Sequence, residues 1–239
     1  MTRHQWPLGL FIKTPAPHIV EILALADLDF AVLDAEHAPF DRAMLDMMML
    51  AGRATGLPLL VRVSDTSTST IGAALDLGAA GVMVPHVASI DMARAVVAST
   101  RYHQGARGYS SAPRHAGYGA LSMIEAIAAA HAVQVLVQIE HPDAALQAGE
   151  ILALDGVDGI VIGRADLTIA LGESDTSAPR VEACVQRIFD AVRSSTKIKG
   201  VVVSSAAERE RYAALGANWF IMGSDQSLLR AAAKQLLSA

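Results

Sequence analysis

The chain has one cysteine, few aromatic residues and no excess of positive charge. The single cysteine, Cys184, can form neither an intrachain disulfide nor a cysteine-based metal cluster. Only 5% of the residues are aromatic although 52% are hydrophobic, so alanine, leucine and valine must fill most of a large core. The net charge of -5 and the absence of a Lys/Arg-rich block argue against nucleic acid as a partner, since phosphate binding requires a basic surface.

Long hydrophobic runs are also missing. No apolar run reaches the roughly 18 to 20 residues that a membrane span requires. The polar N-terminal residues are not followed by the apolar core of a signal peptide. We therefore expect a cytoplasmic protein without a membrane partner. A chain of 239 residues fits one domain spanning positions 1–239.

Short apolar runs alternate with longer helix-like stretches. The runs are rich in Val, Ile and Leu, which suits parallel strands buried on both faces. The predicted strands are residues 9–12, 30–33, 59–63, 81–85, 134–139, 159–162, 200–203 and 219–222. The predicted helices are residues 17–26, 42–54, 70–77, 90–99, 121–130, 144–154, 181–194, 206–215 and 227–237.

This alternation predicts an α/β fold, a (β/α)8 TIM barrel. A doubly wound open sheet is the alternative. It is disfavoured because Lys13-Thr14-Pro15-Ala16, and not a glycine-rich phosphate-binding turn, follows the first strand.

Polar residues gather where the predicted strands end, which is where barrel enzymes build their active sites. Three apolar strands run into acids, in Asp34-Ala35-Glu36-His37, Gln138-Ile139-Glu140 and Gly163-Arg164-Ala165-Asp166. The polar residues expected at this end are Asp34, Glu36, His37, Arg62, His86, Gln138, Glu140 and Asp166.

Glu140 and Asp166 are the candidate metal ligands. Two carboxylates without cysteine or a helical pair of histidines favour an oxygen-preferring ion such as Mg²⁺ or Mn²⁺. The competing interpretation is that each acid caps the helix that follows it. Their joint position at strand ends favours the metal site.

His37 and Arg62 are the candidate catalytic groups. His37 has an ordinary pKa close to neutrality, which suits an acid/base. Arg62 lies inside an apolar strand, where a fixed cation is costly unless it meets an anion. Arg62 therefore either forms a structural ion pair with Glu36 or stabilises a substrate carboxylate or an enolate.

The longest stretch without helix or strand signals is residues 102–119. Such loops in compact domains are usually functional or disordered. Arg107, Arg114 and His115 lie in it and either touch a substrate or remain solvated. His86, His103 and His131 carry little specific signal.

Taken in order, these motifs resemble the HpcH/HpaI family of class II pyruvate aldolases, of the 4-hydroxy-2-oxoheptanedioate and 2-dehydro-3-deoxyglucarate aldolase type. The resemblance covers almost the whole chain. It rests on Gly9-Leu10-Phe11, Leu33-Asp34-Ala35-Glu36-His37-Ala38-Pro39, Val61-Arg62-Val63, the segment 75–85, Arg107-Gly108, Val137-Gln138-Ile139-Glu140, Gly156-Val157-Asp158-Gly159, Ile162-Gly163-Arg164-Ala165-Asp166-Leu167 and Leu215-Gly216-Ala217.

The resemblance implies a barrel of the phosphoenolpyruvate/pyruvate type that cleaves a 4-hydroxy-2-oxo acid to pyruvate and an aldehyde, reversibly, through a pyruvate enolate. Mg²⁺, Mn²⁺ or Co²⁺ would be held by Glu140 and Asp166. Gln138 and the backbone of Ala165 and Asp166 would lie near the bound pyruvate. His37 would act as acid/base, and Arg62 would stabilise the enolate.

The resemblance also implies an oligomer, a hexamer built as a trimer of dimers, in which the last helix packs on a neighbouring subunit. It assigns Asp76 to support the basicity of His37. Asp76 is predicted just before the fourth strand, at the opposite end of its own barrel. We therefore expect any contact between Asp76 and His37 to come from another subunit, with Asp34 as the alternative partner inside the subunit.

The chain departs from the family pattern at Arg164, where proline is typical, at Phe11, where tryptophan is typical, and in the loop 102–119. Arg164 either adds a cation beside the metal, favouring an anionic substrate, or reaches solvent. Of the lysines, only Lys13 is expected near the site, so no Schiff-base mechanism is predicted. The alternative functions are a citrate-lyase-like acyl-CoA lyase and a non-catalytic oxo-acid-binding barrel.

Overall fold

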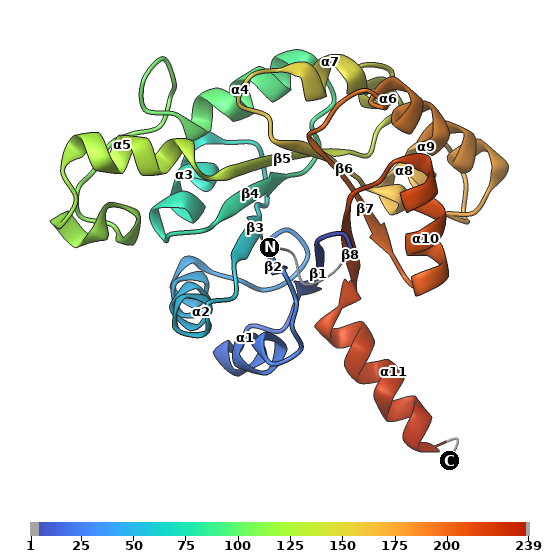
Figure 1. Ribbon diagram of the computed structural model, residues 1–239, viewed down its shortest axis with the longest axis horizontal. Helices are drawn as coiled ribbons and strands as arrows, with labels where there is room; N and C mark the ends of the chain where they lie inside the picture. The colour runs from blue at the N-terminus through green and yellow to red at the C-terminus, as the bar shows by residue number, and fades with distance from the viewer. Residues whose placement is uncertain (1–4, 238–239) are drawn as a thin grey trace.

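The structure, a computed structural model, describes residues 5–237 of the chain. Eight parallel strands close into a barrel in chain order, with the last strand paired to the first (Figure 1). The strands are β1 (Leu8–Ile12), β2 (Phe30–Asp34), β3 (Leu59–Arg62), β4 (Gly81–Val84), β5 (Gln134–Ile139), β6 (Gly159–Ile162), β7 (Ile198–Val203) and β8 (Trp219–Ser224). The predicted (β/α)8 barrel is confirmed, and the open sheet is excluded.

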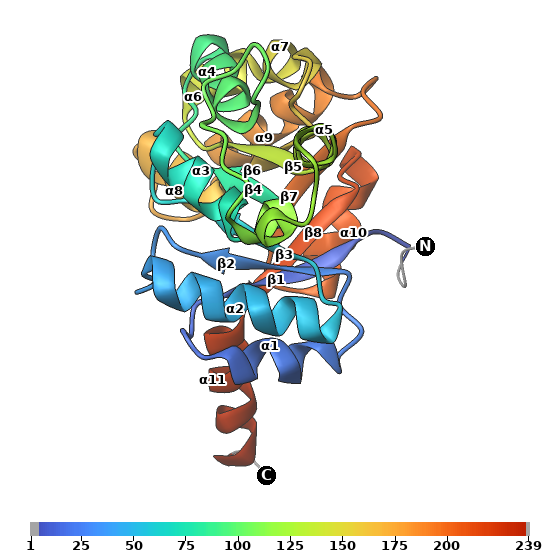
Figure 2. The same cartoon turned by 90° about the vertical axis from the view of Figure 1, so that its left-hand side faces the viewer.

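Helices connect the strands on the outside of the barrel. They are α1 (Pro17–Ala24), α2 (Arg42–Thr55), α3 (Thr68–Asp76), α4 (Ile90–Thr100), the 3₁₀ turn η1 (Arg114–Gly119), α5 (Met123–His131), α6 (Pro142–Leu146), α7 (Ala148–Ala153), α8 (Arg164–Ala170), α9 (Pro179–Ala191), α10 (Ala206–Leu215) and α11 (Asp225–Leu237). Figures 1 and 2 both show α11 standing off from the body of the molecule. Its leucines Leu228, Leu229, Leu236 and Leu237 are exposed.

Side chains alternate between two cores along each strand, because successive residues of a strand point to opposite faces. Phe30 and Val32 of β2 fill the barrel interior, whereas Ala31 and Leu33 pack beneath the helices. The same period places Asp34 inside the barrel at the carboxyl end of β2. The cluster that fills the interior consists of Phe11, Phe30, Val32, Leu60, Met83, Leu136, Val161, Trp219 and Ile221.

The structure differs from the sequence predictions mainly in short helices. The segment 144–154, predicted as one helix, is divided into α6 and α7 at Gln147, whose side chain accepts a hydrogen bond from the backbone N–H of Ile90. Helix α8 was not predicted, because its seven residues follow β6 after the single residue Gly163 and are too few to show a helical period. Strand β7 begins at Ile198, two residues earlier than predicted.

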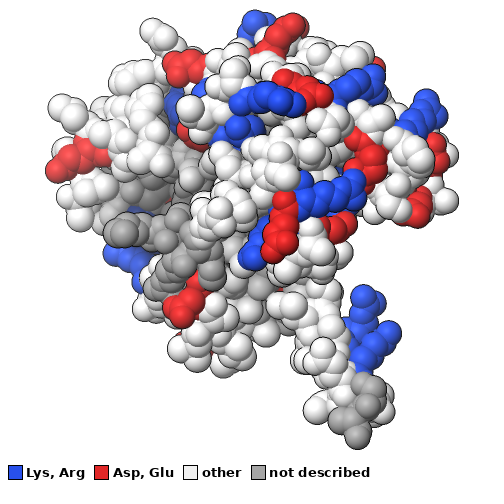
Figure 3. Space-filling model, turned by 45° about the vertical axis from the view of Figure 1, so that its right-hand side comes forward, with Lys and Arg blue, Asp and Glu red and all other residues white. Residues whose placement is uncertain are grey.

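Acidic and basic side chains are interspersed over the face of the molecule that Figure 3 shows. That face carries no broad basic area of the kind that phosphate backbones require. In the described part of the chain, no helix is both long enough and apolar enough to cross a membrane.

Candidate functional site

Because side chains alternate between the two faces of a strand, four polar residues point into the barrel at its carboxyl end. Asp34 ends β2, Arg62 ends β3, and Gln138 lies in β5 directly before Ile139 and Glu140. All four polar side chains are buried. Buried polar groups are costly unless they meet partners, so their concentration here marks a built site.

Asp34 and Arg62 form the tightest ion pair of this end. The two residues are opposite each other in the register of β2 and β3, and Arg62 donates from Nε and Nη2 to the two Asp34 oxygens at 2.9 and 2.7 Å. Lys13, just after β1, places its ammonium 2.9 Å from Asp34 Oδ2. Burial disfavours the charged carboxylate, but the hydrogen bonds and charges of Arg62 and Lys13 outweigh it and lower the pKa of Asp34.

Arg62 also reaches Glu36, whose Oε2 lies 3.3 Å from Arg62 Nε. The ion pair expected between Arg62 and Glu36 is therefore present, together with a closer pair to Asp34 that the sequence analysis did not anticipate. The Arg62 guanidinium also lies over the Phe11 ring, 4.5 Å from its centroid. Arg62 is fixed from three sides, with one edge toward the cavity.

His37 stands at the rim, with 52% of its side chain exposed. Asp34 Oδ1 accepts a hydrogen bond from the backbone N–H of His37 at 3.2 Å, which fixes the turn that carries the ring. The ring itself faces Glu36, with Nε2 3.6 Å from Oε2. Within the subunit, Asp34 therefore positions the backbone of His37, and Glu36 is the carboxylate that approaches its imidazole.

Glu140 and Asp166 face each other across β5 and β6. Glu140 accepts hydrogen bonds from Gln138 Nε2 at 2.7 Å and from the backbone N–H of His86 at 2.5 Å. Burial raises the pKa of Glu140, His86 opposes this effect, and the negative charges of Asp166 and Glu36 add to it. Asp166 lies in the first turn of α8 and is exposed.

The donors at this position fit a hard divalent cation. Glu140 and Asp166 line one cavity of about 280 Å³ together with His86. Among the described residues, Oε1 of Gln138 is buried without a hydrogen-bond partner, and it belongs to the side chain that contacts Glu140. No group of three or more His, Cys, Asp or Glu arranged for a metal occurs in residues 5–237. The candidate ligands are thus two carboxylates, which Mg²⁺ and Mn²⁺ accept with water or substrate completing the shell.

His86 is a site residue that the sequence analysis left without a role. Its Nε2 lies 2.8 Å from Glu36 Oε1, and its Nδ1 lies 3.1 Å from Glu140 Oε1. The backbone of His86 has a φ of 58°, a conformation that non-glycine residues rarely adopt. The imidazole therefore joins the His37 side of the site to the Glu140 side. The available signal was its place directly after Pro85 at the end of β4.

A larger cavity of about 450 Å³ opens at the same end of the barrel. It extends from Lys13 after β1 to Asp166 in α8, and Ala165 lies in its wall. Its lining residues are Phe11, Lys13, His37, Arg62, Gln138, Gly163, Arg164, Ala165, Asp166, Thr176, Val202, Gly223, Ser224 and Ser227. The candidate acid/base His37, the candidate catalytic cation Arg62 and one candidate metal ligand, Asp166, thus line the same cavity.

Arg164 lines the same cavity as Asp166, but its guanidinium is paired within the protein. Its guanidinium neither stands free beside the metal ligands nor reaches solvent, because only 10% of the side chain is exposed. It donates to both oxygens of Glu208 at 3.0 and 3.1 Å and to the hydroxyl of Tyr212 at 2.9 Å. Arg164 therefore attaches α8 to α10, and its charge is neutralised there.

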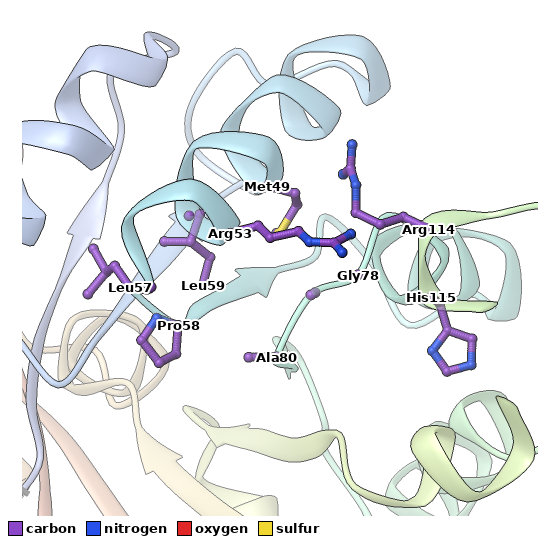
Figure 4. Close-up of a pocket in the computed structure, with 12 residues that line it drawn as sticks. Met49, Arg53, Leu57, Pro58, Leu59, Gly78, Ala80, Arg114 and His115 are labelled. Carbon is purple, nitrogen blue, oxygen red and sulfur yellow. The ribbon is translucent and has the colours of Figure 1, made fainter. Parts of the chain in front are cut away.

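The loop 102–119 lies at the amino-terminal end of the barrel, so within one subunit Arg107, Arg114 and His115 are at the opposite end from His37. Helix α4 runs back along the barrel and delivers the loop to the start of β4. There Arg114 contacts Asp46 and the carbonyl of Leu77. Arg114 and His115 line a pocket of about 420 Å³ that also includes Gly78. Figure 4 shows both side chains at this pocket.

Asp76 lies at the end of α3, as the sequence predicts, and so at this same amino-terminal end. Arg107 Nη2 donates to its Oδ1 at 3.0 Å. Asp76 and His37 therefore belong to opposite ends of one barrel.

The chain is similar to known proteins over nearly its whole length. The model of the HpcH/HpaI aldolase/citrate lyase family matches residues 7–232. A 5-keto-4-deoxy-D-glucarate aldolase of Klebsiella pneumoniae is 34% identical, with 100% of this chain and 94% of that protein covered. A protein of the same name from Escherichia coli is 33% identical, with 97% and 91% covered.

Solved structures agree over nearly the whole chain. An HpcH/HpaI aldolase/citrate lyase family protein of Burkholderia cenocepacia superposes with a TM-score of 0.93 at 29% identity, covering 98% of this chain and 93% of that one. The citrate synthase SbnG gives a TM-score of 0.87 at 28% identity, covering 98% and 92%.

Proposed function

We propose that the protein cleaves a 4-hydroxy-2-oxo acid reversibly to pyruvate and an aldehyde, because the chain belongs to the HpcH/HpaI aldolase/citrate lyase family. The predicted enzyme class, a class II pyruvate aldolase, is confirmed by the family match and the curated relatives. The main support for this reaction is that four residues lie together at the carboxyl end of the barrel. They are Glu140, Asp166, Arg62 and His37.

Glu140 and Asp166 would hold the divalent cation, Mg²⁺, Mn²⁺ or Co²⁺. When bound, the cation polarises the 2-oxo group and stabilises negative charge on its oxygen. Gln138 and the backbone of Ala165 and Asp166 orient the pyruvate half of the substrate beside it. Gln138 is held for this purpose, because Glu140 fixes its amide nitrogen and leaves its oxygen free of the other described residues.

His37 removes the proton from the C4 hydroxyl of the substrate, directly or through water. The C4–O bond then becomes the aldehyde carbonyl, and the electron pair of the C3–C4 bond passes into the enolate of pyruvate. Arg62 faces the developing enolate charge with a guanidinium that Asp34 holds in place. Return of a proton to C3 completes pyruvate.

The acyl-CoA lyase alternative receives no additional support from the site. A CoA thioester carries several phosphate charges and would need basic side chains at the mouth. Three cations line the larger cavity, and two of them, Arg62 and Arg164, are largely buried and paired with carboxylates. The remaining cation, Lys13, is a single ammonium and does not match several phosphate charges.

Pyruvate release tests the function directly. We expect a coupled assay across 4-hydroxy-2-oxo acids to show activity with Mg²⁺, Mn²⁺ or Co²⁺, and chelation to abolish it. Borohydride added with pyruvate should not inactivate the protein, because Lys13 is engaged by Asp34. Covalent trapping at Lys13 would replace the metal mechanism with a Schiff-base mechanism.

Replacing His37 with alanine should lower the rate of cleavage about 10²- to 10⁴-fold, the range typical of a lost acid/base. Metal affinity should remain close to that of the wild type, because His37 lies at the rim and Glu140 is held by Gln138 and His86. Calorimetric titration with Mn²⁺ beside the kinetic assay separates the two effects. A parallel loss of metal binding would assign His37 to the metal site instead.

We further propose that the protein forms a hexamer in which α11 packs on a neighbouring subunit and Asp76 of one subunit approaches His37 of another. The exposed leucines of α11 and the separation of Asp76 from His37 within the chain support this arrangement. Mixing inactive Asp76→Ala and His37→Ala proteins, after dissociation and reassembly, should then restore part of the activity. Full activity of a diluted monomer would disprove the shared site.

A further inference from the structure

Lys13 is a charged group of the cavity that the reaction described above does not use. It follows β1, and 28% of its side chain is exposed. Its ammonium contacts Asp34 Oδ2 at 2.9 Å, which uses one of three N–H donors. The other cation on Asp34, Arg62, is 7% exposed and also approaches Glu36. Lys13 is therefore the more accessible of these two cations.

The segment that carries Lys13 is fixed by the start of α11. Asp225 is buried and accepts hydrogen bonds from the backbone N–H of Lys13 at 2.9 Å and of Thr14 at 3.0 Å. A buried carboxylate that holds two consecutive amides restricts the backbone of this segment. The Lys13 ammonium therefore reaches the cavity from a backbone segment that is fixed by hydrogen bonds.

The position of Lys13 is opposite the candidate metal ligands. In a closed barrel of eight strands, β1 and β5 are four strands apart in either direction, so they face each other across the mouth. Glu140 follows β5, and Asp166 follows β6. A substrate whose oxo-acid half lies beside Asp166 and Gln138 would direct its other end toward β1 and β8.

The wall at that far end is polar. Ser224, Ser227 and Thr176 belong to the same cavity lining as Lys13, and the Ser227 hydroxyl donates to the carbonyl of Ser224 at 2.8 Å. Arg164 also borders the cavity, but its charge is paired with Glu208. An accessible ammonium in a cavity that also carries hydroxyls is suited to bind a carboxylate or another small anionic group.

We propose that Lys13 determines specificity for the aldehyde half of the substrate by binding a carboxylate at its far end. This inference rests on the aldolase function proposed above. The preferred substrate is then a 4-hydroxy-2-oxo acid with a second carboxylate, and the released aldehyde carries that group. Asp34 keeps the ammonium in position, and the incoming carboxylate takes one of its remaining N–H donors.

The test uses two substrates of equal length, 4-hydroxy-2-oxoheptanedioate and its amide at the carboxyl group remote from the oxo group. Wild-type protein should show a kcat/KM about tenfold or more higher for the dicarboxylate than for the amide. Lys13→Met and Lys13→Gln should reduce that ratio to near one, and Lys13→Arg should retain most of it. Lys13→Gln keeps a hydrogen-bond donor toward Asp34, so it separates loss of charge from loss of that contact.

Two outcomes overturn the inference. One is a wild-type protein that cleaves both substrates equally well. The other is a Lys13→Met protein that loses activity equally on both, because Lys13 would then act only through Asp34. Exchange of the pyruvate methyl protons in deuterated buffer, which needs no aldehyde, tests the proposed function separately. Wild-type protein lacking both exchange and cleavage would refute the aldolase function, whereas exchange with no dicarboxylate preference would refute the role of Lys13 alone.

Discussion

Replacing Glu140 with glutamine is expected to abolish pyruvate release and to remove most of the metal affinity. The substitution conserves the shape of the side chain but removes one of the two candidate carboxylate ligands. Loss of an outer partner of a metal site typically costs roughly 10- to 100-fold in affinity or activity, and loss of a ligand should cost more. Titration of the variant with Mn²⁺, followed by calorimetry, measures the affinity.

Glu150→Gln is the matched control. Glu150 lies on α7 and is exposed, so the same loss of a carboxylate there should change neither metal affinity nor activity. An E140Q protein that binds Mn²⁺ as tightly as the wild type would show that Glu140 is not a ligand. The buried carboxylate would then serve to hold Gln138 and His86.

Replacing Arg62 with alanine should destabilise the fold and remove catalysis together. Asp34 is fully buried, and Arg62 donates two hydrogen bonds to it at 2.9 and 2.7 Å, whereas Lys13 supplies a single contact at 2.9 Å that would remain in the variant. Breaking a buried ion pair by removing one partner typically costs about 3 to 5 kcal/mol, because the remaining charge loses its compensation. Urea unfolding monitored by circular dichroism measures the loss in the free energy of unfolding.

Arg94→Ala provides the comparison, because Arg94 forms an exposed ion pair with Asp91 on α4. Such surface pairs are worth about 0 to 1 kcal/mol. Equal destabilisation by the two substitutions would contradict the account of a buried pair at Asp34. Arg62→Lys should lie between wild type and Arg62→Ala in stability, because a lysine keeps the charge but loses the two-point contact.

The ion pair between Asp34 and Arg62 also predicts how the stability of the fold depends on pH. Because the pKa of Asp34 is lowered in the folded protein, its contribution is complete above its unfolded pKa of about 4 and is lost as the pH falls through the folded value. The wild type should therefore lose stability below about pH 4. In Arg62→Ala this loss should be smaller, since the folded and unfolded pKa values of Asp34 move closer together.

Much of this architecture could be predicted from residue patterns. Apolar runs rich in Val, Ile and Leu located the eight strands, and the order of strands and helices predicted the barrel. The period of two within a strand also places Asp34 and Arg62 on the interior face, because Val32 and Leu60 precede them by two positions. Gln138 follows Leu136 in the same way.

Short elements and long side chains escaped prediction because local sequence does not specify them. Helix α8 is too short to show a period, and the break at Gln147 depends on a contact with Ile90 from another part of the chain. Arg164 has the length to reach several surroundings. Its destination beside Glu208 and Tyr212 depends on the packing of α8 against its neighbours.

The Asp34-Ala35-Glu36-His37 segment shows which features of the site the sequence determines and which depend on the tertiary structure. The sequence by itself determined that these residues end a buried strand at the catalytic end of a barrel, because hydrophobic period and strand order are local properties. Only the tertiary structure decided that Asp34 pairs with Arg62 and Lys13, that Glu36 faces His37, and that His86 joins Glu36 to Glu140. Arg62 ends β3, and Lys13, His86 and Glu140 follow β1, β4 and β5, so the closure of the barrel and its register determine which of these residues meet.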